Sequence, residues 1–309
     1  MMTTILDTDI GTDIDDAFAL IYLLKKKTLA GITTVFRNSV KRARLCKAIM
    51  HSMNIEGIEV YAGVDAPFIQ EPEKIEPPQC KQNYDEKGAY IPPQCAKEYD
   101  VFSVPVKNAV QYMIETCRAS ENTEIVAIGA LTNIAAALRI APDIIPRLRL
   151  TIMGGCLKKL SLNGEDPHHV AEWNILCDPE AAHIVFSSGV KARMVGLDVT
   201  LDCALPQRVF ERIQKLGVCP ILDSLIKKWS AYYSTSQPIL FDPVAAASLY
   251  CDCLTFETKK MNVVLEGKDR GATVESEGGF EIEVAVSRNN EAFYNEFLSV
   301  LEKKDKELP

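Results

Sequence analysis

The sequence has no apolar run long enough for a transmembrane helix, and its first residues become acidic before a signal-peptide pattern could form. Cationic runs are short as well, the longest being Lys25-Lys26-Lys27. With 34 basic and 42 acidic residues the formal net charge is -8, so neither a membrane nor nucleic acid is expected as a partner. We expect a cytoplasmic protein.

Patterns typical of disulfide frameworks and zinc sites are also missing. The ten cysteines contain no Cys-x-x-Cys pair, and the four histidines have no metal-ligand spacing. We therefore expect buried thiols in a reducing compartment, and no zinc enzyme.

The remaining composition is that of an ordinary globular protein, with 47% hydrophobic and 25% charged residues in a chain of 309. No break in composition divides the chain, which favours a single domain over residues 1–309. Apolar runs rich in Val and Ile alternate with amphipathic segments. The expected strands are residues 3–6, 32–36, 58–61, 125–128, 148–153 and 192–195, and the expected helices are residues 15–26, 40–53, 105–119, 133–140 and 179–188, with further helices from Pro206 onward.

This alternation predicts an α/β fold with an open, mostly parallel, doubly wound sheet flanked by helices. Residues 260–265 and 280–286 are expected to add strands at a sheet edge, and residues 290–303 a closing helix. Residues 63–104 are rich in proline and charge, which is typical of a lid or binding loop.

The segment DTDIGTDIDD, residues 7–16, places five carboxylates between the first expected strand and the first expected helix. In an open α/β sheet, ligands bind at the carboxyl ends of strands. One or two of these acids could simply cap the helix, but five repel one another unless a cation joins them. Oxygen ligands favour Ca²⁺, with Mg²⁺ as the less favoured choice.

With this turn in place, the sequence resembles the inosine-uridine preferring nucleoside hydrolases, whose first motif is an Asp-x-Asp-x-Gly turn closing on Asp-Asp-Ala. Further blocks follow in the order found in that family. They are Arg37-Asn38, Gly129-Ala130-Leu131-Thr132-Asn133, Met153-Gly154-Gly155, Glu172-Trp173-Asn174, Asp178-Pro179-Glu180 and Phe241-Asp242-Pro243.

The resemblance implies hydrolysis of the N-glycosidic bond of a ribonucleoside or related N-riboside. It implies a Ca²⁺ held by Asp9, Asp16, Asp242 and the backbone carbonyl of Thr132, with Asp9 also acting as the general base for the attacking water. It further implies a homodimer or homotetramer. The side chains expected to bind the nucleoside are Asp15, Asn38, Met153, Glu172, Trp173 and Asn174.

Three features depart from the family pattern. The turn is two residues longer, so Asp13 could replace Asp15 as a ligand or sugar contact. Phe241 stands where well-known members have the histidine that protonates the leaving base, for which Tyr84, His168 or His169 are alternative donors. An asparagine expected shortly before Glu172 is not in its usual place, where Asp166 stands with Asn163 nearby. These departures point to an altered leaving group.

Two other interpretations remain open from the sequence. A haloacid-dehalogenase-like phosphatase also begins with a strand ending in Asp-x-Asp, although Gly11 does not fit its motif. A non-catalytic ribose-binding or nucleoside-binding homologue would explain the missing histidine.

Overall fold

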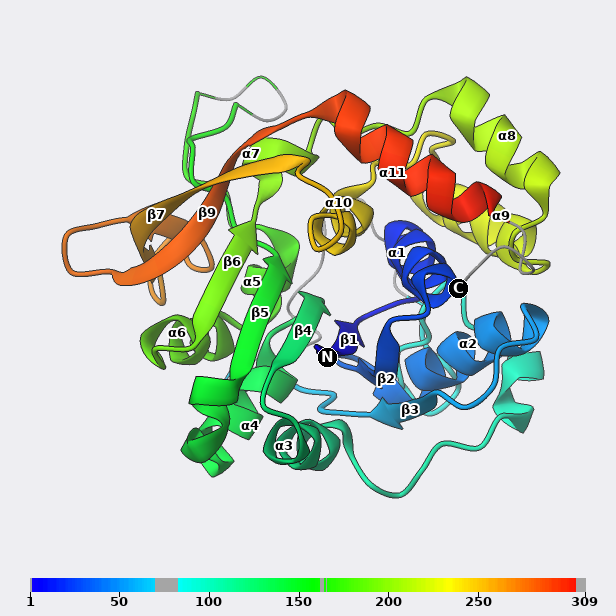
Figure 1. Cartoon of the computed structure of the whole chain (residues 1–309), viewed down its shortest axis with the longest axis horizontal. Coiled ribbons are helices and arrows are strands. Elements are labelled where there is room, and N and C mark those ends of the chain that lie inside the picture. Colours follow the sequence, from blue (N-terminus) through cyan, green and yellow to red (C-terminus); the bar gives the residue numbers. More distant parts are fainter. Residues whose placement is uncertain (1, 70–82, 162–163, 165, 304–309) are drawn as a thin grey trace.

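The computed structural model describes residues 2–69, 83–161, 164 and 166–303 (Figure 1). In this part of the chain the strands form one nine-stranded sheet in the order β3-β2-β1-β4-β5-β6-β9-β7-β8. Neighbours from β3 to β9 pair in parallel, and β7 runs antiparallel to both β9 and β8. The predicted open, mostly parallel α/β sheet is confirmed.

The strands are β1 (Thr3–Thr8), β2 (Leu29–Thr34), β3 (Glu59–Ala62), β4 (Thr123–Ile128), β5 (Leu148–Met153), β6 (Lys191–Val195), β7 (Leu254–Val263), β8 (Thr273–Glu275) and β9 (Phe280–Arg288). The α-helices are α1 (Asp15–Lys26), α2 (Ser39–Ser52), α3 (Ala109–Ala119), α4 (Thr132–Ile140), α5 (Trp173–Cys177), α6 (Pro179–Ser187), α7 (Leu197–Thr200), α8 (Gln207–Leu216), α9 (Leu222–Tyr233), α10 (Phe241–Ala247) and α11 (Asn290–Glu302), and two 3₁₀ segments are η2 (Lys97–Val101) and η3 (Pro142–Arg147).

The central strands are buried on both faces, because their side chains alternate between two hydrophobic cores. In β4, Val126 and Ile128 enter the core that contains α1, α10 and α11, whereas Ile125 and Ala127 enter the core that contains α3, α4 and α6. This is the two-sided burial expected of a parallel sheet between helical layers (Figure 1). The predicted single-domain organisation stays a prediction.

Among the element boundaries that differ from the sequence-based expectation, two have clear local reasons. β2 ends at Thr34 instead of continuing to Phe36, because Phe36, Arg37 and Asn38 all have positive φ angles, which strand geometry does not allow. α3 begins at Ala109 instead of residue 105, since Asn108 caps the helix by accepting a hydrogen bond from the Gln111 backbone N–H.

The C-terminal strands lie at one end of the sheet, but the two predicted strands are not at its edge, because β9 pairs with β6 and β7, and β7 pairs with β9 and β8. The edge strand is β8, which the sequence did not predict. The predicted loop between Gly63 and Val104 contains the short 3₁₀ segment η2, and its residues 70–82 lie outside the described residues. Across the described part of the chain, no helix is both long and apolar enough to cross a bilayer.

Candidate active site

The aspartate-rich turn lies at the point where the strand order of the sheet reverses. The chain proceeds from β1 outward to β2 and β3 on one side, and β4, β5 and β6 extend the sheet on the other. A crevice forms outside the carboxyl ends of strands at such a switch point, and ligands of open α/β sheets bind there. The turn follows β1 directly and lies in this place.

The base of the turn is fixed by the buried side chain of Arg42 on α2. Its guanidinium donates hydrogen bonds to the backbone carbonyls of Asp9 and Ile10, and to that of Phe36 at 2.6 Å. Arg42 is 1% exposed and therefore joins the turn after β1 to the turn after β2 inside the protein. Buried carbonyls need such partners, since leaving them unpaired costs free energy.

Gln94 holds the middle of the turn by donating to the backbone carbonyls of three consecutive residues. Its backbone N–H donates to the Gly11 carbonyl at 2.9 Å, and its side-chain amide donates to the carbonyls of Thr12 and Asp13. Gly11 has a φ of +112°, and a Cβ there would lie 3.0 Å from the Cβ of Pro92. Glycine is therefore required at this position for both its backbone angle and its lack of a side chain.

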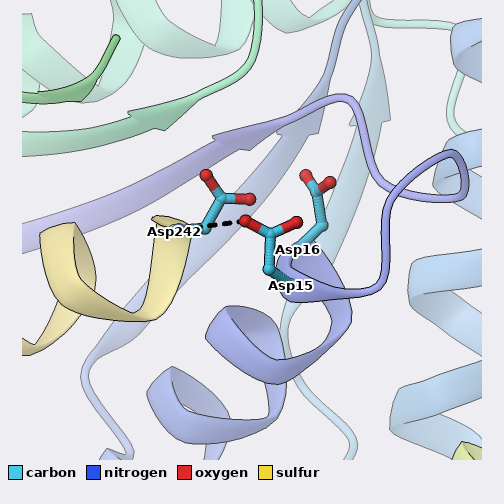
Figure 2. Close-up of side chains that lie close together, drawn as sticks. All are labelled: Asp15, Asp16 and Asp242. Carbon is cyan, nitrogen blue, oxygen red and sulfur yellow. Dashed lines mark hydrogen bonds between the residues drawn. The ribbon is translucent and has the colours of Figure 1, made fainter. Parts of the chain in front are cut away.

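Three buried carboxylates meet at the mouth of the turn. Asp15 and Asp16 belong to the first turn of α1, and Asp242 belongs to the first turn of α10, so the group joins distant parts of the chain (Figure 2). Each offers an oxygen within 4.8 Å of the others. The Asp242 backbone N–H donates to Asp15 Oδ2 at 3.1 Å, and Thr8 Oγ1 donates to Asp16 Oδ1 at 2.5 Å. These contacts hold the carboxylates in a fixed arrangement.

The electrostatics of this group favour a bound cation. Burial raises the pKa of Asp16 well above its ordinary range, and repulsion from Asp9 and Asp15 raises it further. For Asp242 burial is again the main cause, followed by Asp15 and Asp16. Each carboxyl would thus hold a proton more tightly than in water, and a hard divalent cation can take the place of those protons. The donor set consists of oxygen alone, which fits Ca²⁺ or Mg²⁺.

Asp9 lines the same pocket but is not a member of this three-carboxylate group. Burial raises the pKa of Asp9, while the Arg42 charge and the adjacent Trp173 indole lower it. The predicted ligand set of Asp9, Asp16 and Asp242 therefore differs from the observed grouping, in which Asp15 takes the third place. The reason is the packing of α10 against α1, which brings the Asp242 backbone N–H into hydrogen-bond contact with Asp15.

Glu172 and its neighbours form one wall of the pocket, at the start of α5. The Glu172 carboxylate caps α5 by accepting from the backbone N–H groups of Asn174 and Ile175, and it also accepts from Gly155 at 3.0 Å. Burial raises the pKa of Glu172 to about 7 despite these hydrogen bonds. The amide of Asn174 donates to the Met153 carbonyl at 3.1 Å, which attaches α5 to the end of β5.

The pocket has a volume of about 260 Å³, which is suitable for a small molecule. Trp173, Tyr233 and Phe241 contribute aromatic walls, and Met153 and Asn174 also line it. Its carboxylates come from three separate regions of the chain. They are Asp9, Asp13, Asp15, Asp16, Glu172 and Asp242.

Other residues predicted from the sequence lie outside this lining. The Asn38 amide donates to the Tyr90 carbonyl at 2.9 Å, and the Thr132 hydroxyl donates to Asp178 Oδ2 at 2.7 Å. Their predicted roles in ribose and metal binding stay predictions. Neither Tyr84 nor the pair His168 and His169 lines the pocket, and Asn163 lies outside the described residues.

The sequence did not single out Arg42, Gln94 or Tyr233. Arg42 is part of a basic helix segment that looks solvent-exposed, and only the position of α2 beneath the turn shows that it is buried. Gln94 follows a Pro-Pro pair, which suggested a loop but not its partner. Tyr233 ends α9 and belongs to no motif.

Comparison with known proteins gives the same indication as the site. Residues 4–295 match the sequence model of the inosine-uridine preferring nucleoside hydrolases. The chain belongs to this family. A probable ribonucleoside hydrolase of Dictyostelium discoideum is 30% identical over 287 residues, covering 84% of this chain and 80% of that protein. The pyrimidine-specific ribonucleoside hydrolase RihB of Escherichia coli K12 is 32% identical over 218 residues, covering 69% of this chain and 65% of its own length.

Solved structures of nucleoside hydrolases share the whole fold. A purine-preferring ribonucleoside hydrolase from Gardnerella vaginalis superimposes with a TM-score of 0.77 at 25% identity, covering 97% of this chain and 98% of its own. A plant nucleoside hydrolase gives a TM-score of 0.78 at 23% identity over 98% and 99% of the two chains, which supports the fold alone. This nucleoside hydrolase is therefore an enzyme of the N-glycosidase class, and the phosphatase interpretation has no support.

Proposed function

We propose that this nucleoside hydrolase cleaves the N-glycosidic bond of a ribonucleoside or related N-riboside with the help of Ca²⁺, releasing ribose and the free base. The observation that carries the proposal is the group formed by Asp15, Asp16 and Asp242, whose oxygens lie within 4.8 Å of one another inside a pocket. All three side chains are at most 4% exposed. Such a group is costly without a cation, because buried like charges repel.

The residues present fit a hard divalent cation. Asp16 and Asp242 are the proposed ligands from the carboxylate group, with Asp9 and the Thr132 carbonyl completing the set suggested by the family resemblance. Calcium is favoured over magnesium because it accepts more oxygen ligands in less regular geometry. When bound, the cation supplies positive charge that orients the ribose hydroxyls.

The protein's own groups then carry the proton transfer and hold the sugar. Asp9 accepts a proton from water as the water oxygen attacks the anomeric carbon. Positive charge grows on the ribose as the bond to nitrogen breaks. The carboxylates around the pocket stabilise this charge more in the transition state than in the ground state, which is what lowers the barrier.

The remaining pocket residues are proposed to position the nucleoside. Asp15, Glu172 and Asn174 offer polar groups for the sugar, while Met153 and Trp173 give apolar contact. Asn38 is proposed as a further sugar contact from the resemblance. The family resemblance also supports a cytoplasmic homodimer or homotetramer, which light scattering after gel filtration would measure.

The first test combines one substitution with removal of the metal. Asp9→Asn keeps the shape of the side chain but not its basicity, and should lower kcat by roughly 10²–10⁴-fold. Ribose release from inosine and uridine, measured as reducing sugar, gives the rate. Chelation should abolish turnover, and Ca²⁺ should restore it more fully than Mg²⁺.

The matched control is Asp252→Asn, which makes the same chemical change at an exposed site near α10 and should leave the rate close to that of the unmodified enzyme. Near-normal hydrolysis by Asp9→Asn would contradict the assigned base. Equal hydrolysis of ribosides and 2′-deoxyribosides would contradict recognition of the ribose diol.

A further inference from the structure

The lining of the pocket is strongly acidic. Six carboxylates line it, and no lysine, arginine or histidine does so among the residues that the structure describes. Arg42 is buried nearby, but its guanidinium faces backbone carbonyls beneath the turn. Asp13 and Glu172 lie outside the proposed ligand set, so a bound divalent cation would leave these two carboxyl groups to the ligand. A cationic substrate is therefore favoured over a neutral one, and an anionic one is opposed.

The pocket also lacks an imidazole to protonate a leaving group. All four histidines of the chain lie in the described part of the structure, and none lines the pocket. His51 packs against Phe102, and His183 packs against Phe280. In place of a histidine beside Asp242 the wall has Phe241, which cannot donate a proton. Tyr233 also lines the pocket, but a phenol is a much weaker acid than an imidazolium.

A neutral nucleoside needs that proton. When its glycosidic bond breaks, the bonding electron pair goes to the base, which leaves as an anion unless an acid protonates it. An aglycone whose ribosylated nitrogen is already positively charged has no such requirement. The same electron pair then neutralises the nitrogen, and the departing ring is uncharged.

We infer that the preferred substrate of this site is an N-riboside with a cationic aglycone of the N-ribosylpyridinium type. The inference rests on the proposed hydrolysis and names the substrate class for it. Water forms the new C–O bond at the anomeric carbon, and the C–N bond breaks with its electron pair passing to the pyridinium nitrogen. The water proton passes to Asp9 and then to solvent, so no external acid or redox partner is required.

The walls of the pocket suit a flat cation. Trp173, Tyr233 and Phe241 offer aromatic faces, which attract cationic rings. Asp13 lies in the turn between Asp9 and Asp15, is partly buried and lines the pocket, and its Oδ1 accepts a hydrogen bond from the Ile14 backbone N–H at 2.6 Å. It does not belong to the three-carboxylate group and is thus available to a ligand's positive charge.

The experiment compares kcat/KM for N-ribosylnicotinamide, uridine and inosine with the Ca²⁺-loaded full-length enzyme. The cationic riboside should exceed both neutral nucleosides by at least about tenfold, a difference of about 1.4 kcal/mol in transition-state stabilisation. Equal or faster hydrolysis of uridine or inosine would overturn the inference while leaving the proposed function intact. If the enzyme hydrolyses none of the three substrates, the proposed function itself is rejected.

Inhibition by unreactive ring compounds measures how well the pocket binds a cationic ring, separately from the intrinsic reactivity of the cationic riboside. 1-Methylnicotinamide and nicotinamide have the same ring and amide, but only the first carries a positive ring nitrogen. We expect 1-methylnicotinamide to inhibit at least fivefold more strongly. A stronger effect of neutral nicotinamide would overturn the role assigned to the charged pocket.

Phe241→His tests the missing acid. For each substrate we compare kcat/KM of the variant with kcat/KM of the unmodified enzyme. This ratio should be at least tenfold larger for uridine and inosine than for N-ribosylnicotinamide, because only the neutral substrates need a proton from the new imidazole. Phe241→Leu is the control for loss of the aromatic wall without gain of an acid. A proportional change for all substrates in Phe241→His would overturn the leaving-group argument.

Discussion

Neutralising Asp242 should make the metal-free enzyme more stable and weaken its response to metal. Asp242→Asn retains the size of the side chain and its backbone N–H, which donates to Asp15. Two unit charges 4.8 Å apart repel by about 3 kcal/mol at an effective dielectric constant of about 20. Because burial and repulsion already raise the pKa of Asp242, part of this repulsion is relieved by protonation. We expect a net gain of about 1–3 kcal/mol in the free energy of unfolding.

The assay is thermal unfolding in a chelator and in excess Ca²⁺. In the chelator, Asp242→Asn should unfold roughly 2–6 °C above the unmodified enzyme. Calcium at a hundred times its dissociation constant should stabilise the unmodified enzyme by about 2.7 kcal/mol, and the variant by much less. Asp252→Asn, the exposed control, should behave as the unmodified enzyme does. A variant that is less stable in chelator and keeps the full calcium response would refute the assignment of this group as a metal site.

Two further substitutions test buried charges elsewhere. Arg42→Met should lower the free energy of unfolding, measured by urea denaturation, by about 3 kcal/mol or more, because it leaves the carbonyls of the aspartate turn unpaired. Arg42→Lys should recover only part of this stability. A loss below about 1 kcal/mol in Arg42→Met would contradict the role of Arg42. Burial raises the pKa of Glu124, so the folded state binds its proton more tightly than the unfolded state and stability falls as pH rises from the ordinary glutamate range through the raised value. Glu124→Gln keeps an acceptor for the Thr151 hydroxyl, which donates to Glu124 at 2.7 Å. It should make the decline between pH 4.5 and pH 7, measured by urea unfolding, smaller, and the other buried carboxyls such as Glu172 account for the rest. An unchanged decline would contradict the assignment to Glu124.

Regular elements with strong patterns could be predicted from the sequence almost to the residue. β5 and α1 match their predicted bounds because an apolar run and an amphipathic period each end in clear signals. β7 is different, since it begins at Leu254, six residues earlier than expected. Its early residues include the exposed polar residues Thr255, Glu257 and Thr258, and their pairing with β9 is a long-range contact that local sequence does not show.

The candidate site also has one part that the sequence predicts and one part that it does not. The carboxylates of the turn and Asp242 could be identified because their motifs are local and occur in family order. Which of them group together could not, because the hydrogen bond from the Asp242 backbone to Asp15 depends on how α10 packs against α1. The role of buried side chains that hold the turn, such as Gln94, could not be predicted for a similar reason. Their hydrogen-bond partners are backbone carbonyls, which leave no pattern in the sequence.

The helices α1 and α10 are in contact but far apart in the sequence, and this has a consequence for biosynthesis. As the ribosome makes the chain from its N-terminus, Asp15 and Asp16 emerge more than two hundred residues before Asp242, which must dock beside them. The nascent polypeptide must keep its acidic turn without this third carboxylate throughout that interval. Assembly of the three-carboxylate group is thus a late event in maturation, after six of the nine described strands of the sheet have been translated.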